Sequence, residues 1–101
     1  KFVVLIRRAE NLSIAGYREK AHGLAVQAGT LVVFEGTSFA ARNPDFDEGY
    51  NFSDSIQISG PSELSFQVLS GRPTASSSWI ISLNGGAGKI VSVNEEGAVF
   101  W

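Results

Sequence analysis

The stretch Leu-Ala-Val-Gln-Ala-Gly-Thr-Leu-Val-Val-Phe-Glu, residues 24–35, decides the fold class. It holds two short apolar runs, Leu24–Gln27 and Thr30–Glu35, on either side of the dipeptide Ala28-Gly29. β-Branched and aromatic residues are typical of strands, and a glycine between two such runs indicates a hairpin turn. Four consecutive apolar residues in the second run favour a strand that is covered on both faces.

Similar short runs recur along the chain, separated by segments rich in Gly, Pro, Asn and Ser. Besides the two runs above, the expected strands are Phe2–Arg8, Ser55–Ser59, Glu63–Leu69, Trp79–Leu83, Lys89–Val93 and Ala98–Trp101. Strands that recur roughly every 8–12 residues are typical of sandwiches and barrels. The sequence therefore predicts an all-β fold, an antiparallel β-sandwich or a small β-barrel of about eight short strands.

One of these strands has a helical alternative. In Glu63–Leu69, strict alternation would place Leu64, Phe66 and Val68 on one buried face of a strand. A helix competes with this interpretation, because Ser62 after Pro61 has the composition of a helix start. The strand is favoured, since the residues at Phe66 and Val68 are good strand formers.

Length and composition limit the classes of protein. The chain has 101 residues, of which 44% are hydrophobic and 18% charged, so one folded domain spanning residues 1–101 is expected. It contains no Cys and no Met, which excludes disulfide scaffolds and zinc sites built on Cys. The start at Lys1 suggests a domain excised from a larger protein or a processed chain. The compartment stays open, with an extracellular or cell-surface location favoured.

The inventory of reactive side chains argues against an enzyme. His22 is the only histidine, and its surroundings, Lys20-Ala21-His22-Gly23, predict an ordinary loop histidine. No G-x-S-x-G nucleophile turn occurs. The segment Gly85-Gly86-Ala87-Gly88-Lys89 lacks the first glycine and the following helix of a phosphate-binding loop, so it is expected to be a hairpin loop. We expect no cofactor apart from a calcium ion at the following segment.

The segment Asn43–Asp54 is expected to be an acidic loop. Oxygen-bearing side chains recur in it at near-alternate positions, and calcium takes 6–8 oxygen ligands from loops of this kind. The candidate ligands are Asp45, Asp47, Asn51 and Asp54. Gly49 breaks the order of an EF-hand loop, so the alternative is an exposed acidic loop whose aromatic residues cover the core.

Aromatic residues near turns suggest a binding surface. Flat rings accept the C–H faces of sugars, and neighbouring amides and hydroxyls supply hydrogen bonds. The candidate ligand-binding residues are Tyr17, Tyr50, Asn51 and Trp79. For Trp79 the alternative is a core position at the start of a strand. We therefore expect a non-catalytic module that recognises a carbohydrate or a protein surface. We expect Phe100 and Trp101 to pack back onto the core, the alternative being that the native chain continues beyond them.

Two other functions remain as alternatives. A self-associating structural subunit, such as a surface or virion component, would form a homo-oligomer through an exposed edge strand, either Phe2–Ile6 or Ala98–Trp101.

The net charge of −2 disfavours general nucleic-acid binding, and no apolar run is long enough to span a membrane.

The nucleic-acid alternative is based on a resemblance. Ala21-His22-Gly23 with residues 29–37, and residues 59–62 with residues 68–72, resemble the small accessory domain found beside GIY-YIG nucleases and related restriction proteins. These pieces cover about a third of the chain, and the acidic loop stands where the family has a helix. The resemblance implies a non-catalytic nucleic-acid accessory role, and it implies a helix over Glu63–Leu69.

Overall fold

The computed structural model describes residues 2–16, 20–53, 55–83, 86 and 88–101. This part of the chain forms one α-helix, one short 3-10 helix and eight strands. In chain order these elements are α1 (Phe2–Ile14), β1 (His22–Gln27), β2 (Thr30–Glu35), η2 (Pro44–Phe46), β3 (Glu48–Asn51), β4 (Ile56–Ser59), β5 (Glu63–Phe66), β6 (Ser77–Leu83), β7 (Lys89–Val93) and β8 (Val99–Phe100). None of the helices in these residues is long and apolar enough to cross a membrane.

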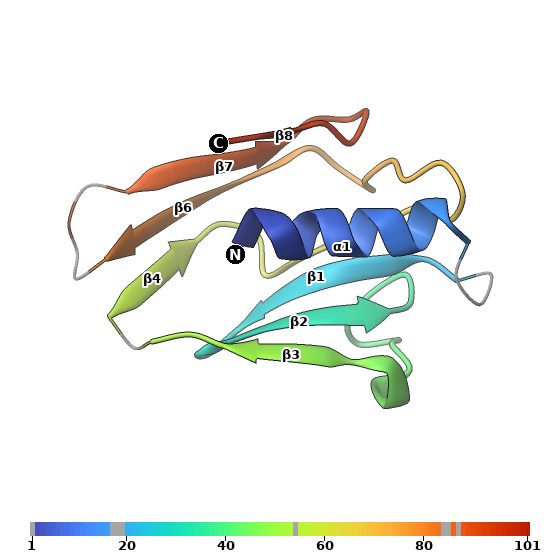
Figure 1. Cartoon of the computed structure of the whole chain (residues 1–101), viewed down its shortest axis with the longest axis horizontal. Coiled ribbons are helices and arrows are strands. Elements are labelled where there is room, and N and C mark those ends of the chain that lie inside the picture. Colours follow the sequence, from blue (N-terminus) through green and yellow to red (C-terminus); the bar gives the residue numbers. More distant parts are fainter. Residues whose placement is uncertain (1, 17–19, 54, 84–85, 87) are drawn as a thin grey trace.

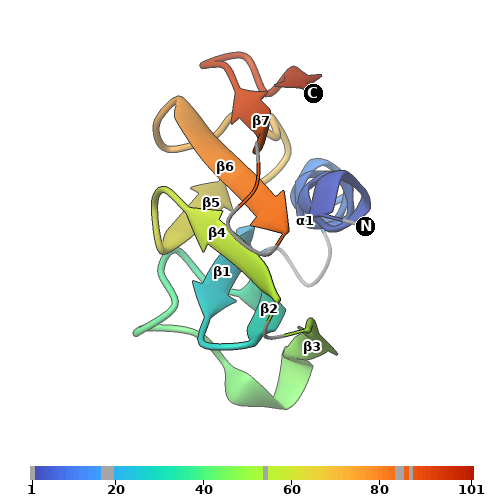
Figure 2. The same cartoon turned by 90° about the vertical axis from the view of Figure 1, so that its left-hand side faces the viewer.

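The strands form two antiparallel sheets of four strands each. Sheet A has the order β3-β2-β1-β5, and sheet B has the order β4-β6-β7-β8. The two sheets lie one above the other in Figure 1, and α1 lies on one side of them in Figure 2. The expectation of a mostly β, antiparallel fold with eight strands is confirmed. Each sheet is open, with β3 and β5 as the edges of sheet A and β4 and β8 as the edges of sheet B.

The first expected strand, Phe2–Arg8, is wrong, because these residues begin the helix α1. Phe2, Leu5, Ile6 and Ala9 are buried, at the spacing that places residues on one face of a helix. The helix ends at Ile14, and in the turn after it Gly16 has φ of 64°, a left-handed conformation that glycine adopts without a Cβ clash. As a helix, the segment packs across three strands of sheet A, β1, β2 and β5.

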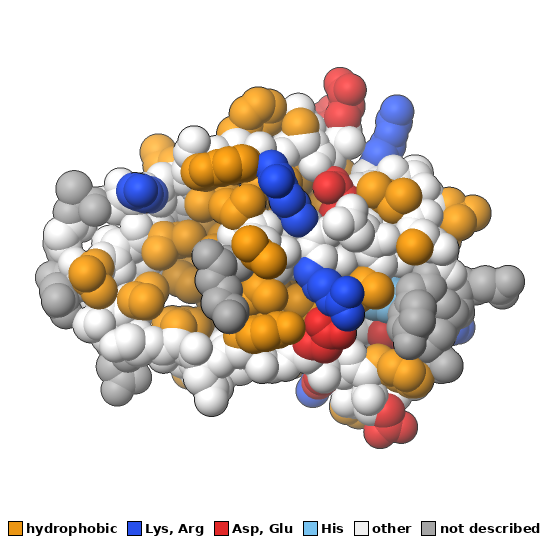
Figure 3. Space-filling model, in the orientation of Figure 1, with side chains coloured by type: hydrophobic (Ala, Val, Ile, Leu, Met, Phe, Trp, Pro, Cys, Tyr) orange, Lys and Arg blue, Asp and Glu red, His pale blue; other side chains and the backbone are white. Residues whose placement is uncertain are grey.

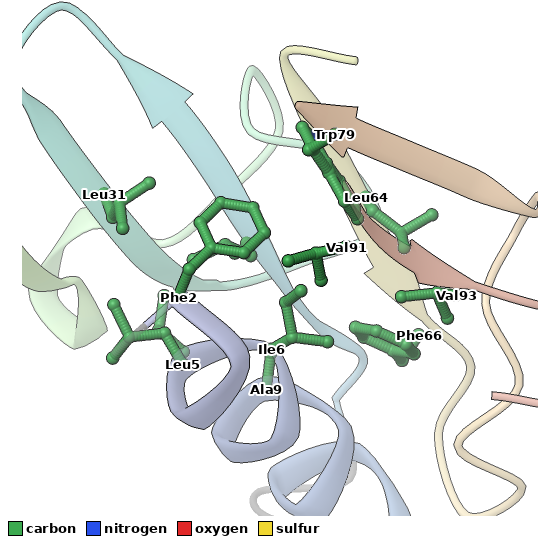
Figure 4. Packing of buried hydrophobic residues seen from close by; sticks show 12 residues of the cluster. Phe2, Leu5, Ile6, Ala9, Leu31, Leu64, Phe66, Trp79, Val91 and Val93 are labelled. Carbon is green, nitrogen blue, oxygen red and sulfur yellow. The ribbon is translucent and has the colours of Figure 1, made fainter. Parts of the chain in front are cut away.

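The core lies between α1 and the two sheets. Figure 4 shows Phe2 and Ile6 of the helix pointing toward Trp79, Phe66 and Val91. The rings of Phe2 and Trp79 meet edge to face with their centres 5.2 Å apart, a favourable aromatic geometry. This pair connects α1 with sheet B.

The hairpin in the stretch that decided the fold class is confirmed. Gln27 pairs with Thr30 across a turn in which Gly29 has φ of 73°. β2 is covered on both faces, as expected, because Leu31 and Val33 face the main core while Val32 and Phe34 belong to a second small cluster. Phe39 from the following segment packs against that second cluster.

Three other local expectations need correction. The segment Glu63–Leu69 is a strand as favoured, without the helix that the nuclease resemblance implies, but the strand ends at Phe66 and Val68 is exposed. The acidic loop Asn43–Asp54 contains η2 and the strand β3. Phe100 and Trp101 are 55% and 72% exposed, so these rings do not pack back into the core as expected.

Candidate functional site

An apolar groove of about 330 Å³ opens between the N-terminal end of α1 and the inner faces of the two sheets. Figure 3 shows hydrophobic side chains gathered around a hollow on the left half of the face that carries α1. Apart from Lys89, every described side chain that lines the groove is apolar: Phe2, Val3, Leu31, Phe52, Ile56, Ile58, Ile81, Val91 and Trp101. The volume lies at the lower end of the roughly 300–1,000 Å³ that is usual for ligand sites.

The path of the chain explains why the groove is open. The chain passes from sheet A to sheet B between β3 and β4. Both of these strands are edges of their sheets. The helix packs chiefly on β1, β2 and β5 of sheet A. The inner residues Ile56 and Ile58 of β4 are therefore only half-buried.

Cations border the groove. Lys89 lines it directly and is exposed. The guanidinium carbon of Arg7 lies 4.8 Å from the centre of the Trp101 ring, within cation–π distance. The groove therefore combines an apolar floor with a positively charged border, although the chain as a whole has a net charge of −2.

A second hollow, of about 440 Å³, is polar and lies at the opposite end of the helix face. It is lined by Arg8, Leu12, His22, Asp45, Phe46, Asp47 and Glu48. Two of its carboxylates are held by arginines: Arg8 donates to Glu48, and the Nε of Arg42 donates to Asp47 at 2.9 Å. The pKa of Glu48 is lowered, chiefly because Arg8 donates hydrogen bonds to its carboxylate.

The expectation that His22 is a loop histidine is wrong, because His22 is the buried first residue of β1. Its Nδ1 lies 3.0 Å from the carbonyl oxygen of Lys20, so this nitrogen carries the proton and donates. Nε2 then faces the carboxylate of Glu35 at 3.9 Å. Burial lowers the pKa of His22, with the nearby carboxylates of Glu35 and Glu48 acting in the opposite direction. The paired charges and the neutral imidazole favour a structural role for this hollow.

The structure does not bring the predicted ligand-binding residues together. Trp79 is 1% exposed and donates its indole N–H to the carbonyl oxygen of Pro61 at 2.9 Å, so it is a core residue and offers no ring face to a ligand. Tyr50 is half-buried against the core, and Asn51 accepts a hydrogen bond from Thr30. Tyr17 lies outside the described residues.

The candidate calcium ligands are also spread over different elements. Asp45 lies in η2, Asp47 caps this helix and is paired with Arg42, and Asn51 ends β3. Asp54 lies outside the described residues. Among the residues that the structure does describe, no three His, Cys, Asp or Glu side chains are grouped closely enough to hold a metal ion.

The groove was not predicted from the sequence. Ile56, Ile58, Ile81 and Val91 carry the period-2 pattern of inward strand positions, which predicts burial and says nothing of a gap between two sheets. Phe2 and Val3 were assigned to a strand. The one signal in the sequence was the charged Lys89 at an inward position of the run Lys89–Val93, in register with Val91 and Val93.

Comparison with known proteins adds no relative. A scan against protein-family models, a search of the curated proteins and a search of the solved structures each find no match to this chain.

Proposed function

We propose that this chain is a non-catalytic recognition module that binds an apolar, acidic segment of a partner protein in the groove. The observation that carries the proposal is the lining of the groove, which comes from α1 and from both sheets and is apolar except for Lys89. Exposed Trp101 continues this lining to the surface. A few buried anchor residues, Trp often among them, supply most of the energy in protein recognition.

A protein segment fits this groove better than a carbohydrate. Sugars need several hydrogen-bonding side chains around a flat ring, whereas Lys89 is the one polar side chain among the described lining residues. The aromatic residues that favoured a sugar lie elsewhere: Trp79 is buried, and Tyr50 packs against the core. An apolar partner side chain would instead find matching surface on every wall of the groove.

The charge at the border identifies the chemistry of the partner. Lys89 lines the groove, and Arg7 lies against the exposed ring of Trp101. Both side chains are positively charged. A segment with Asp or Glu next to its apolar residues would be attracted to this border, and a basic segment would be repelled. Rim charges act mostly on the rate and selectivity of binding, and the apolar contacts hold the segment.

The proposal is tested by selecting random peptides displayed on phage against three proteins. These are the wild-type chain, Val3→Glu, which places a charge in the groove, and Val4→Glu, the matched control at a neighbouring helix position that is 65% exposed. We expect the wild type and Val4→Glu to enrich the same apolar peptides with acidic residues, and Val3→Glu to enrich none of them. Equal enrichment by Val3→Glu, or binding to a glycan array in place of peptides, would contradict the proposal.

The contribution of the border is tested with a selected peptide in solution. Arg7→Gln and Lys89→Gln should each weaken binding several-fold at low salt, and the loss should shrink as salt is added, because screening removes the attraction. Arg72→Gln, an exposed arginine outside the groove lining, serves as the control. The fluorescence of Trp101 reports binding directly.

A further inference from the structure

A second hollow with the chemistry of a binding site lies at the end of sheet B where β6 begins and β7 ends. Its volume is about 410 Å³, within the roughly 300–1,000 Å³ that is usual for ligand sites. It shares no described lining residue with the apolar groove. Its described lining is mostly polar and uncharged: Ser76, Ser77, Ser78, Ser92, Val93, Asn94 and Phe100.

The register of sheet B places an aromatic ring beside two hydroxyl groups. Ser92 of β7 is opposite Ser78 of β6 on one side and opposite Phe100 of β8 on the other. These three residues therefore form one row across neighbouring strands, with about 4.5–5.5 Å between adjacent positions. Phe100 is 55% exposed, so part of its ring is open to a ligand in the hollow.

The polar groups of the hollow are available for hydrogen bonds. None of its four serine hydroxyls is hydrogen-bonded to another residue in the described part of the chain. The Oδ1 of Asn94 accepts hydrogen bonds from the backbone N–H groups of Glu96 at 3.0 Å and Ala98 at 2.9 Å. These two bonds orient the side-chain amide and leave its NH₂ group as a donor. The hollow thus offers an oriented donor and hydroxyls that both donate and accept.

We propose that this hollow binds a neutral saccharide, with the C–H face of a sugar ring packed on Phe100. Sugar hydroxyls both donate and accept hydrogen bonds, which matches serine and asparagine side chains, and the C–H groups pack favourably on an aromatic ring. The residues that the sequence predicted for a sugar, among them Tyr50 and Trp79, do not line this hollow.

The lining disfavours the other classes of ligand. An apolar peptide segment would find only Phe100 and Val93 as apolar contacts, in contrast to the groove. An anion would find no Lys, Arg or His among the described lining residues, and a metal ion would find no carboxylate there. A ligand that is neutral and polar but has one apolar face satisfies all of the described lining.

A glycan array that carries neutral, sialylated and sulfated oligosaccharides tests the proposal. We expect the wild type to bind a neutral oligosaccharide, and NMR titration with that compound should shift the signals of Ser78, Ser92 and Phe100. Binding to no glycan, or to charged glycans alone, overturns the proposal.

Two substitutions of Phe100 distinguish stacking on a ring from general apolar contact. Phe100→Tyr keeps the flat ring and should bind within about threefold of the wild type, whereas Phe100→Leu keeps only apolar bulk and should bind about tenfold more weakly. Circular dichroism establishes that both variants are folded. Equal affinity of the two variants overturns the proposal.

The hydroxyls are tested with a matched pair of serines. Ser92→Val should weaken binding about three- to tenfold, because a hydrogen bond is lost. Ser82→Val, at another half-buried serine of sheet B that does not line the hollow, is the control and should bind like the wild type. Equal affinity of these two variants contradicts a role for the hydroxyl.

The groove and the hollow are separated by one further comparison. Val3→Glu, which blocks the groove, should bind the oligosaccharide like the wild type, and a selected peptide should not compete with it. Loss of saccharide binding in Val3→Glu, or competition by the peptide, would place the sugar in the groove and overturn this assignment. Failure of the peptide experiment and failure of this one are therefore distinguishable.

Discussion

Arg8 of α1 and Glu48 at the start of β3 form a two-point ion pair that ties the helix to the edge of sheet A. The Nη2 of Arg8 donates to one carboxylate oxygen of Glu48 at 2.8 Å, and its Nε donates to the other at 3.1 Å. These residues are 40 positions apart in the sequence. The pair thus links the helix to β3, which α1 does not otherwise pack against as it does against β1, β2 and β5.

This pair should contribute modestly to stability. The side chains of Arg8 and Glu48 are 51% and 32% exposed, so solvent screens the attraction, and we expect a coupling of about 0.2–1 kcal/mol. A double-mutant cycle with Arg8→Gln and Glu48→Gln, followed by chemical denaturation, measures it. The coupling should fall when salt is raised to about 1 M, and a coupling that is unchanged by salt would argue against an electrostatic origin.

Ser13 should be worth more than the ion pair. This fully buried residue accepts a hydrogen bond from the backbone N–H of His22 at 2.9 Å, and its hydroxyl lies 3.1 Å from the carbonyl oxygen of Phe66. Ser13→Ala leaves these buried backbone groups unsatisfied, which should lower the free energy of unfolding by about 1–3 kcal/mol. Ser70→Ala, at an exposed turn, is the control and should change it by less than about 0.5 kcal/mol.

His22 should make stability depend on pH. Its pKa in the folded state is lowered from 6.5, chiefly by burial, so the unfolded chain takes up a proton first as the pH falls. Above about pH 6.5 the imidazole is neutral in the folded and the unfolded chain, so protonation of His22 does not change the free energy of unfolding. At lower pH, each unit by which the folded-state pKa lies below the unfolded one reduces this free energy by up to about 1.4 kcal/mol. Unfolding measured between about pH 7 and 5 should lose free energy more steeply in the wild type than in His22→Gln. Parallel profiles would show that His22 does not titrate differently in the two states.

Gly23 is required by close packing in β1. A Cβ at this position would lie 2.5 Å from the carbonyl oxygen of Leu64 and 2.5 Å from the ring of Phe34. Gly23→Ala should therefore destabilise the chain by about 1–3 kcal/mol, as overpacked cores do. Gly49→Ala is the matched control in β3, because a Cβ there would lie 3.8 Å from the nearest atom, the Cγ2 of Thr30, which is an ordinary contact. Equal thermal stability of the two variants would contradict this packing.

The sequence predicted most strands because their patterns are local. Thr30–Glu35 and Lys89–Val93 match β2 and β7 at every residue, since apolar runs bounded by turn residues are typical of strands. The run Phe2–Ile6 failed for a physical reason: five consecutive apolar residues fit a strand, and the helical spacing of Phe2, Leu5, Ile6 and Ala9 becomes visible only over a longer window.

The site could not be predicted in the same way. The groove depends on how far sheet A and sheet B diverge and on which of them α1 covers. Neither property can be inferred from a local sequence pattern. Asp45, Asp47 and Asn51 are close in sequence, but η2 and β3 separate them and Arg42 takes one of the carboxylates. For Trp79 the sequence left a ligand-binding ring and a core position open, and the register of β6 turns the side chain inward, into the core.

The two tryptophans should report on different parts of the molecule. Trp79 is 1% exposed, with its indole N–H bonded to Pro61, and Trp101 is 72% exposed beside Arg7. Trp101→Phe should therefore leave a blue-shifted emission that acrylamide quenches poorly, while Trp79→Phe should leave a red-shifted emission that acrylamide quenches strongly. Trp79→Phe should also lower the free energy of unfolding by about 1–3 kcal/mol, because the carbonyl of Pro61 loses its donor and the core loses contacts. Similar quenching of the two variants would mean that Trp101 is covered in solution, and the groove that it borders would then be closed.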